Sequence, residues 1–486
     1  MGIETGPAIT TTQQPAPIRA SRVRWGVMLF LCVLAFLTYF DRVCIASTKG
    51  AIERDLHLSE DDMGWILGGF WLAYGLLEIP GGWLGDRYGS RRTLSRIVLA
   101  WSIFTALTGS ASGIISLYLY RFFFGAGEAG AFPNMARVQN AWFPTRAQGR
   151  VGGVLWLIAR WGGGLSYLIF PSLLAAIDSP TARHLFATVP GLGFLSHTAA
   201  WRIGFWVCGL LGLTWVVSFY SWFRDDPAQK RSVNEAELAL IRQDRPASQV
   251  AGHVPSGGRI LLALMGSGSL WAIAGAYMCG SFCWSFFVSW MPEYMSNVQH
   301  ADPNIAKWMN TGPLLVGGAA CLLGGWLSDQ LVRISGRPRL GRVLFPIVGY
   351  ALFGASMFSL RYAQGPKTAL VLMCLASFGN DIGQAAAWAS IIGIGGLYAG
   401  TAFGFINTAA NVIGNSLQPV VGPKVFHHYG WNTLFLIYTC VMATASMLWF
   451  LPNPTKRFYD EEDPSTGPLT AALSPRERGN LGMGEG

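Results

Sequence analysis

Long apolar runs separated by short polar stretches make up most of this chain of 486 residues. Each run is about 20 residues long, which is the length of helix that crosses the hydrocarbon core of a bilayer. We therefore predict an all-α membrane protein with twelve transmembrane helices in two pseudo-symmetric six-helix halves. The expected spans are Trp25–Ile45, Met63–Leu84, Leu94–Ser112, Ile114–Asn134, Gly149–Leu174, Ile203–Phe223, Leu270–Met291, Met309–Leu327, Val343–Leu360, Ala369–Ile391, Thr401–Val420 and Trp431–Leu451.

Polar segments set the expected domain boundaries. The central segment carries charges, Pro, Ser and Gly, and we predict a short interfacial helix near Asn234–Gln243 within it. The end of the chain has acidic residues, Pro and Gly with no apolar period, which is typical of a disordered tail. The expected domains are a cytoplasmic N-terminal tail (1–24), an N-terminal bundle (25–223), a central cytoplasmic loop (224–268), a C-terminal bundle (269–451) and a cytoplasmic tail (452–486).

Composition and charge favour a membrane protein over a nucleic-acid-binding one. Charged residues make up 13% of the chain, whereas a soluble domain carries about a quarter. The net charge of +9 is concentrated between the apolar runs. Arginines gather before the first span and after the second, fourth and eighth, so the positive-inside rule places both termini in the cytoplasm. We expect a monomer in the lipid bilayer of a bacterial inner (plasma) membrane, with no nucleic acid as partner.

The cysteines and histidines are not spaced for metal binding or catalysis. Nearly all of the eight cysteines lie inside apolar runs, where packing is their expected role, and the seven histidines are scattered. The chain also shows no nucleophile and base placed at a common depth. We therefore expect no metal, no cofactor and no enzymatic activity.

Two ionisable residues share one face of the fourth span. Arg121 and Glu128 are seven positions apart, nearly two helical turns, so they lie on one face roughly 10 Å apart. Ionisable groups on one face of a membrane helix must point into protein or a water-filled cavity, which makes them candidates for function. Glu128 is a candidate proton acceptor, because burial favours its neutral form and Arg121 its charged form. The alternative is a structural ion pair between the two.

Four further ionisable residues inside apolar runs are candidates for function. Asp41 and Arg42 in the first span point about 100° apart, so they cannot pair face to face. Arg42 suits an anionic substrate, because a guanidinium binds a carboxylate through two parallel hydrogen bonds, and Asp41 is a second proton candidate; the alternative for both is a location at the membrane interface. Arg160 and Asp381 form a buried pair between the halves, or Arg160 holds a second anionic group of the substrate.

A glycine-rich run in the fourth span matches a nucleotide-binding pattern. Gly125, Gly127 and Gly130 have the spacing of a dinucleotide fingerprint, but that motif needs a preceding strand and a βαβ unit. Here an apolar helix surrounds the glycines, so we expect them to serve close helix packing.

One short motif occurs twice, half a chain apart. The stretch Gly81–Asp86 (Gly-Gly-Trp-Leu-Gly-Asp) recurs as Gly324–Asp329 (Gly-Gly-Trp-Leu-Ser-Asp), each after the second span of its half and before a basic loop. Two six-span halves of parallel topology are typical of transporters that rock around a central site.

These motifs carry a family resemblance. The stretch Gly81–Arg92 resembles the signature loop of the major facilitator superfamily, and the second copy resembles its degenerate partner. Within that superfamily the chain resembles the anion:cation symporters, which include carriers of sugar acids, tartrate and phthalate, and the sialic-acid and vesicular glutamate carriers. The resemblance covers nearly all of Trp25–Leu451 and rests on Tyr39-x-Asp41-Arg42, Arg121-x6-Glu128, Trp142-Phe143-Pro144, Gly404-x-x-Asn407-x-x-x-Asn411 and Gly430-Trp431.

The resemblance implies roles for further residues. It implies that Arg42 contacts a substrate carboxylate and that Glu128 takes part in coupling. The family's substrate-contacting positions fall on Tyr39, Tyr74, Trp388, Asn407 and Asn411. From their place inside apolar runs, and not from the resemblance, Arg121 and Arg160 are further candidate cations and Asp41 and Asp381 further proton candidates; many family members have no charge at the positions of Arg160 and Asp381. In the signature loops we expect conformational latches rather than ligand sites, formed by Asp86, Arg87, Arg91 and Asp329.

The sequence thus favours a secondary active transporter. We expect proton-coupled symport of a small organic anion, a sugar acid such as a hexonate or hexuronate, by alternating access. Two alternatives stay open: efflux of organic anions or drugs by proton antiport, and a membrane sensor that binds a ligand without transporting it. The identity of the anion, the direction of transport and the choice between protons and sodium are not encoded in any motif of the chain.

Overall fold

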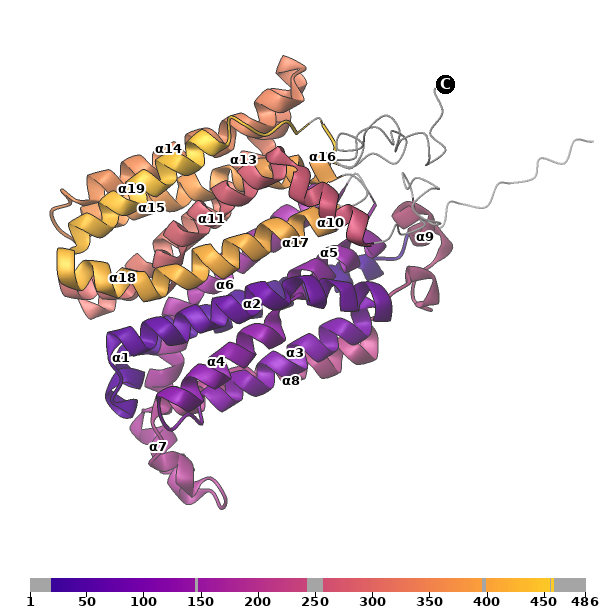
Figure 1. Ribbon diagram of the computed structural model, residues 1–486. Coiled ribbons are helices and arrows are strands. Elements are labelled where there is room, and N and C mark those ends of the chain that lie inside the picture. The colour runs from indigo at the N-terminus through magenta and orange to yellow at the C-terminus, as the bar shows by residue number, and fades with distance from the viewer. Residues whose placement is uncertain (1–18, 145–146, 243–256, 396–398, 455, 459–486) are drawn as a thin grey trace, which may run out of the picture.

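A computed structural model describes residues 19–144, 147–242, 257–395, 399–454 and 456–458, and these ranges contain helices and turns but no β-strand. Figure 1 shows the helices of the first half, in indigo to magenta, beside those of the second half, in orange to yellow. The first half contains α1 (Val23–Leu56), α2 (Glu60–Tyr88), α3 (Ser90–Thr108), α4 (Ile114–Glu128), α5 (Ala131–Trp142), α6 (Gln148–Ile177), α7 (Pro180–Thr188) and α8 (Ala200–Trp222). After α9 (Glu235–Arg242), the second half contains α10 (Gly257–Gly266), α11 (Gly268–Ser289), α12 (Met291–Glu293), α13 (Pro303–Ser335), α14 (Pro338–Leu360), α15 (Pro366–Ile382), α16 (Gln384–Gly395), α17 (Ala399–Ala409), the π-helical turn η7 (Ala410–Asn415), α18 (Ser416–Tyr429) and α19 (Trp431–Leu448).

The all-α fold with twelve spans is confirmed, and three of the spans are broken helices. The fourth span consists of α4 and α5, the tenth of α15 and α16, and the eleventh of α17, η7 and α18. Gly130, with a φ of 82°, allows the break between α4 and α5, because a residue without a Cβ adopts a positive φ without strain. The sequence did not predict these breaks.

Eight of the helical segments in the described residues are long and apolar enough to cross a membrane by length and composition. They include α1, α8, α11, α14 and α19, and the combined segment Pro366–Gly395. The other predicted spans contain a break or mix charged residues with apolar ones, as α3 does with Arg91, Arg92 and Arg96.

The bundle has two ends. We call the end that holds residue 19, α9 and the end of α19 the termini side, and the end that holds the α1–α2 turn the far side (Figure 1). On the far side Ser59 caps α2, because its side chain accepts a hydrogen bond from the N–H of Asp62, whose carboxylate accepts from Ser59 in return. Such a capping box satisfies two otherwise unpaired groups at the helix start.

The repeated motif has the same packing role in each half. Gly81 on α2 lies against the backbone of Ala129 and Gly130, where α4 and α5 break. Gly324 on α13 lies against the backbone of Ile382, where α15 and α16 break. In both halves the motif lets the second span approach the break of the fourth, which supports the predicted pseudo-symmetry.

The glycine run of the fourth span is a packing motif, as predicted. Gly125 lies against the carbonyl of Phe70 on α2, and a Cβ on Gly127 would come within 3.1 Å of the backbone nitrogen of Trp101 on α3. Gly130 packs on Gly81. Gly125 and Gly127 lie within α4 and Gly130 lies at the break between α4 and α5, and no strand precedes them in the described residues.

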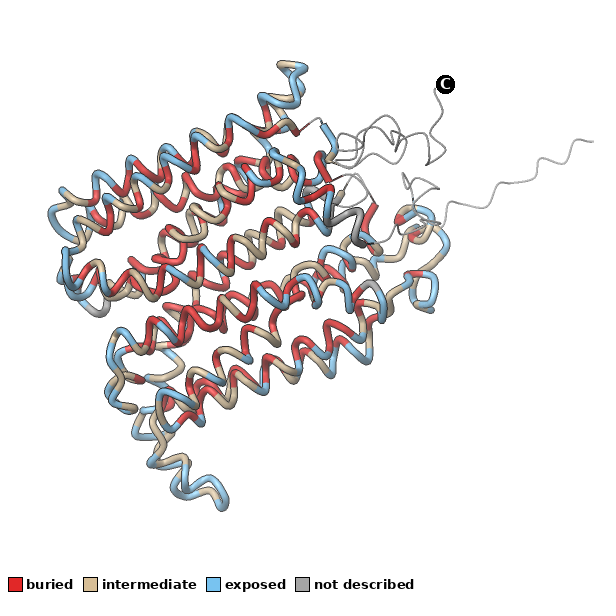
Figure 2. Tube along the Cα trace, in the orientation of Figure 1, coloured by how far each residue is buried: buried red, intermediate tan, exposed pale blue. Residues whose placement is uncertain are grey.

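The two halves meet along two pairs of helices, with buried residues concentrated between the halves (Figure 2). Gly164 on α6 packs against Thr311 and Leu314 on α13. Gly64 and Gly68 on α2 pack against the backbone of α18 at Pro419 and Ser416.

Two side-chain contacts join the halves on the far side. Lys49 on α1 bonds Glu293 on α12, and its ammonium lies 4.0 Å from the centre of the Trp290 ring. Glu60 on α2 lies 2.6 Å from His427 on α18. The structure therefore shows the far side held closed between the halves.

The predicted helix in the central segment is present as α9. Its Glu237 is fully buried and accepts hydrogen bonds from the backbone N–H groups of Val23 and Arg24 at the start of α1. A carboxylate at a helix N-terminus is favoured by the helix dipole, so α9 is anchored to the first half. The predicted tail at 452–486 lies mostly outside the described residues.

Candidate functional site

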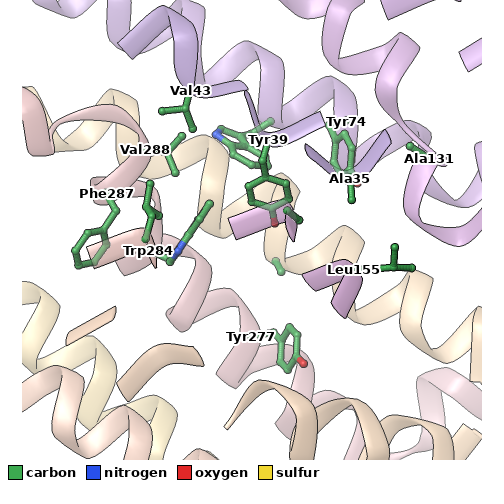
Figure 3. Close-up of a cluster of buried hydrophobic side chains, with 14 of the residues drawn as sticks. Ala35, Tyr39, Val43, Tyr74, Ala131, Leu155, Tyr277, Trp284, Phe287 and Val288 are labelled. Carbon is green, nitrogen blue, oxygen red and sulfur yellow. The ribbon is translucent and has the colours of Figure 1, made fainter. Parts of the chain in front are cut away.

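A cavity of about 80 Å³ lies between the halves and is lined by both. This volume is well below the roughly 300 Å³ of pockets that hold small organic ligands, so the structure shows a contracted site. The first half contributes Tyr39, Arg42, Trp71, Tyr74, Phe132, Trp156 and Arg160, and the second contributes Tyr277, Gly280, Ser281, Trp284, Tyr350, Asn380, Gln384, Phe403, Asn407, Asn411 and Asn415. Figure 3 shows Tyr39 and Trp284 next to each other, with ring centres 6.2 Å apart.

Arg42 and Glu128 form an ion pair at the wall of this cavity. The Nε of Arg42 donates to both carboxylate oxygens of Glu128, at 3.0 and 3.1 Å. The guanidinium also lies near four aromatic rings, the nearest being Tyr74 with its ring centre 4.5 Å away. One terminal nitrogen, Nη2, is buried without a hydrogen-bond partner. Because Nη2 is a hydrogen-bond donor without a partner, the guanidinium of Arg42 can bind a second anionic group once the carboxylate of Glu128 is neutralised.

Arg121 lies behind this pair rather than at the cavity wall. It is 1% exposed, and its guanidinium stacks over Phe124 and Phe70, 4.3 and 5.2 Å from the ring centres. Its Nε and Nη1 are buried without a hydrogen-bond partner. The alternative that Arg121 and Glu128 form a structural pair is therefore wrong in this structure, because Glu128 pairs with Arg42.

Asp41 is buried in the first half. Its carboxylate is 2% exposed, and its Oδ1 has no hydrogen-bond partner. Arg121, Glu128 and Cys208 are its electrostatic neighbours. An unpaired buried carboxylate oxygen costs free energy while the group is charged, which agrees with the predicted role of Asp41 as a proton candidate.

Arg160 and Asp381 pair across the two halves. The Nη2 of Arg160 on α6 donates to Oδ1 of Asp381 on α15 at 2.6 Å, and Asp381 is fully buried. Arg160 also lies over the rings of Trp284 and Tyr39, at 4.3 and 5.8 Å. Because Arg42 lies 5.1 Å from the same Tyr39 ring, two guanidinium groups flank one tyrosine in the cavity.

Replacing Arg160 by methionine is expected to lower the stability of the protein strongly. The change leaves Asp381 buried without a counter-charge, which costs about 3–5 kcal/mol when one partner of a buried ion pair is removed. The double replacement Arg160→Met with Asp381→Asn removes both charges and should recover most of the thermal midpoint. The purified variants in detergent are compared by thermal unfolding; a single variant as stable as the wild type contradicts the expectation.

Three asparagine side chains of the second half line the cavity. Asn407, Asn411 and Asn415 are four positions apart, so they share one face of the eleventh span. The Nδ2 of Asn407 donates to both oxygens of Glu78 on α2, at 2.5 Å each, and Nδ2 of Asn411 donates at 3.3 Å. Asn415 donates to Oδ1 of Asn411 at 2.8 Å.

Aromatic rings of the two halves meet at the cavity. Trp156 stacks on Phe132 with ring centres 4.9 Å apart, and it touches Trp388 of the second half at 5.8 Å. Trp388 packs on Phe403 at 4.3 Å, and its Nε1 is buried without a partner. Trp388 therefore sits beside the cavity, within the aromatic contact between the halves.

The predicted latch residues lie at the termini side, away from the cavity. Arg91 donates to the carbonyl of Tyr220 at 2.6 Å, and its backbone N–H donates to Asp225. Arg87 lies over the Trp83 ring, and Asp329 pairs with Arg342 at 2.9 Å inside the second half. The side chain of Asp86 lies outside the described part of the chain. Arg91 thus contacts the first half and the central segment, and Asp329 contacts the second half, so the latch role remains a prediction.

The sequence reasoning missed several residues of the site. Trp71 precedes Tyr74 by one turn, and Asn415 follows Asn411 by one turn, so helical spacing could have found both. Glu78 was the strongest missed signal, because an ionisable residue inside a membrane span is a functional candidate by default. Trp284, Tyr277 and Tyr350 carry no pattern that separates them from ordinary packing residues. Among the described residues, no group of three or more His, Cys, Asp and Glu side chains is placed to hold a metal ion.

Comparisons with known proteins agree with this geometry. The family model of the Major Facilitator Superfamily matches residues 31–419 and, in a second alignment, residues 273–478. A probable sulfoacetate transporter of Cupriavidus necator is 27% identical, with 93% of this chain and 99% of that protein covered. A probable galactarate/D-glucarate transporter of Bacillus subtilis is 28% identical, with 92% and 96% covered.

The solved structures give the same fold. A bacterial homolog of the human lysosomal transporter Spinster, in an inward-facing and occupied conformation, superposes with a TM-score of 0.66 at 18% identity. The match covers 88% of this chain and 96% of that one.

Proposed function

Because this chain belongs to the major facilitator superfamily, we propose that it carries a small organic anion together with protons by alternating access. The anion proposed is a sugar acid, such as a hexonate, hexuronate or hexarate. The protein is a transporter of this superfamily, and its relatives carry names of sugar-acid and sulfoacetate transporters. The observation that supports an anionic substrate is that two guanidinium groups, Arg42 and Arg160, line the cavity between the halves, both close to the Tyr39 ring centre (5.1 and 5.8 Å).

The ion pair between Arg42 and Glu128 provides a way to couple proton uptake to anion binding. Arg42 is bonded to Glu128, so the pair presents little net charge to a substrate. When Glu128 takes up a proton it no longer holds the guanidinium, which is then free to bind a substrate carboxylate through parallel hydrogen bonds. Proton and anion thus enter together, and the loaded cavity stays close to neutral.

Arg160 and Asp381 provide a second pair of the same kind. Asp381 reaches Arg160 from the second half, so a second proton on Asp381 would free a second cation for an anion with two charged ends. A sulfoacetate or hexarate carries such ends, whereas a hexonate carries one. Asp41, near Arg121 and Glu128, is the proposed relay for protons in the first half.

The contacts between the halves bear on which side of the protein is open during alternating access. The Lys49–Glu293 ion pair and the contact between Glu60 and His427 close the far side, and by the positive-inside rule that side is extracytoplasmic. We infer that the structure stands closer to the state that opens to the cytoplasm. In this proposal the termini are cytoplasmic and the protein lies in the inner membrane of a bacterium.

Uptake by proteoliposomes tests the proposal. Labelled galactarate, galactonate and sulfoacetate are offered with an imposed proton gradient, with a sodium gradient, or with neither, and galactose serves as an uncharged control. We expect at least one anion to accumulate against its gradient only when protons drive it. Binding of an anion without flux would indicate a sensor. Accumulation driven only by an outward-directed proton gradient would indicate antiport. Uptake driven by a sodium gradient would mean that sodium takes the place of the proton.

A further inference from the structure

We propose that Glu78 is a positioning residue that switches the amide of Asn407 between hydrogen-bond acceptor and donor toward the substrate, according to whether Glu78 carries a proton. This inference rests on the proposed proton-coupled transport of an organic anion. It assigns a role to a carboxylate that no motif singled out.

Glu78 is placed behind the cavity wall rather than in it. It lies on α2, is fully buried, and is not among the residues that line the cavity, whereas its partners Asn407 and Asn411 are. Among the described residues no ion pair includes Glu78. Its polar contacts are the two amides of the second half and Tyr74 on its own helix.

The charged groups around Glu78 leave it without a cation of its own. Arg42 faces it from α1, but the Nε of that guanidinium is bonded to Glu128 of α4. Tyr74 is the titratable group beside it on α2, and α17 and η7 face it with the amides of Asn407 and Asn411. A buried carboxylate without a paired cation is the kind of group that changes protonation rather than staying charged.

Ionised Glu78 fixes the orientation of the amides. A carboxylate can only accept hydrogen bonds, so Asn407 must turn its Nδ2 toward Glu78, as observed at 2.5 Å from both oxygens. The polar atom that Asn407 has left for a ligand in the cavity is then its Oδ1, an acceptor. This orientation suits a substrate hydroxyl and opposes a substrate carboxylate.

A proton on Glu78 reverses this arrangement. The neutral carboxylic acid gains an O–H donor, and Asn407 satisfies it by turning its Oδ1 toward Glu78 and its Nδ2 toward the cavity. The amide then donates to a carboxylate of the substrate. The wall of the second half therefore binds an anion better after proton uptake, as the Arg42–Glu128 pair of the first half does in the proposed function.

Infrared spectroscopy tests whether Glu78 takes up a proton, independently of any substrate. The full-length wild type in lipid is titrated from mildly alkaline to mildly acidic buffer while the C=O band of protonated buried carboxylic acids is followed. We expect Glu78→Gln to lack part of that band. The matched control is Thr408→Val, which removes the hydrogen bond from Thr408 to the carbonyl of Gly75 between the same two spans without touching a charge, and it should keep the whole band. A Glu78→Gln titration that superposes on the wild type would overturn the proposal.

Transport kinetics test the switch itself, with galactarate as probe. Glutamine presents both a donor and an acceptor, so Glu78→Gln removes the constraint that turns Nδ2 of Asn407 toward residue 78. The amide is then free to donate to the substrate at any pH, and the KM in alkaline buffer should fall about tenfold, the value of one charge-assisted hydrogen bond. Thr408→Val should follow the wild type. Asn407→Leu should keep the infrared band but lose this part of the pH dependence of KM. An unchanged or higher KM in Glu78→Gln contradicts the switch. If the wild type takes up no galactarate, that substrate fails, and the infrared titration still decides whether Glu78 takes up a proton, without which there is no switch.

Discussion

Replacing Arg42 by alanine is expected to abolish uptake of the anion. Arg42 is 5% exposed, borders the cavity and holds Glu128 through its Nε, so alanine removes one of the two cations that line the cavity. Losing a bidentate, charge-assisted contact in a buried site costs about 3 kcal/mol or more, which lowers kcat/KM at least about a hundredfold. Initial rates of labelled galactarate uptake into proteoliposomes measure the effect.

Two controls separate this loss from a folding defect. Arg42→Lys keeps the charge but loses the planar fork that matches a carboxylate, so we expect intermediate uptake. Arg42→Ala combined with Glu128→Gln removes the orphaned carboxylate and should restore the thermal midpoint without restoring uptake. Uptake by Arg42→Ala at a near-native rate would mean that the anion binds elsewhere.

The sequence predicted the fold well because membrane spans leave a strong signal. Apolar runs about 20 residues long and the repeated Gly-Gly-Trp-Leu motif depend on local composition and spacing alone. The breaks at Gly130 and at η7 were not predictable in this way. They arise where one helix packs against the backbone of another, as Gly81 does on Gly130, and the sequence does not say which residues will meet.

The sequence predicted which ionisable residues belong to the candidate site, but it did not predict all of the ion pairs that they form. Arg42, Glu128, Arg160 and Asp381 were all identified as ionisable residues in apolar runs, and the structure places each of them in a buried ion pair. The spacing within one helix suggested Arg121 as the neighbour of Glu128, yet Arg42 from another helix takes that place. Pairing between helices depends on tertiary packing, which helical spacing within one segment does not contain.

The balance of positive and negative charges around the cavity connects anion binding to proton uptake in both halves. Three arginines (Arg42, Arg121 and Arg160) are buried beside four carboxylates (Asp41, Glu78, Glu128 and Asp381). Buried charges are tolerated only when they are paired or neutralised, so an incoming anion needs protons on some of these carboxylates. Glu128 and Asp381 are bonded to the two arginines that line the cavity, and a proton on either would release a guanidinium toward the substrate.

Replacing Glu128 by glutamine is expected to separate substrate exchange from proton-driven accumulation. Glutamine has nearly the shape of glutamate but takes up no proton, so Arg42 is no longer held by a charged partner and stays available to the anion. Uptake driven by a proton gradient should fall to the level seen without a gradient, while exchange of external for internal galactarate continues. Measuring both in the same proteoliposomes gives the ratio of driven to passive uptake.

A second buried carboxylate provides the matched control for that ratio. Glu237 is as buried as Glu128 but bonds the start of α1 outside the cavity, so Glu237→Gln should leave the ratio unchanged even if it lowers stability. If Glu128→Gln keeps full proton-driven accumulation, the coupling proton is carried by another group, and Asp41→Asn becomes the next variant to measure. If exchange is lost as well, Glu128 acts by holding Arg42 in place, because a residue needed only for the proton would leave exchange intact.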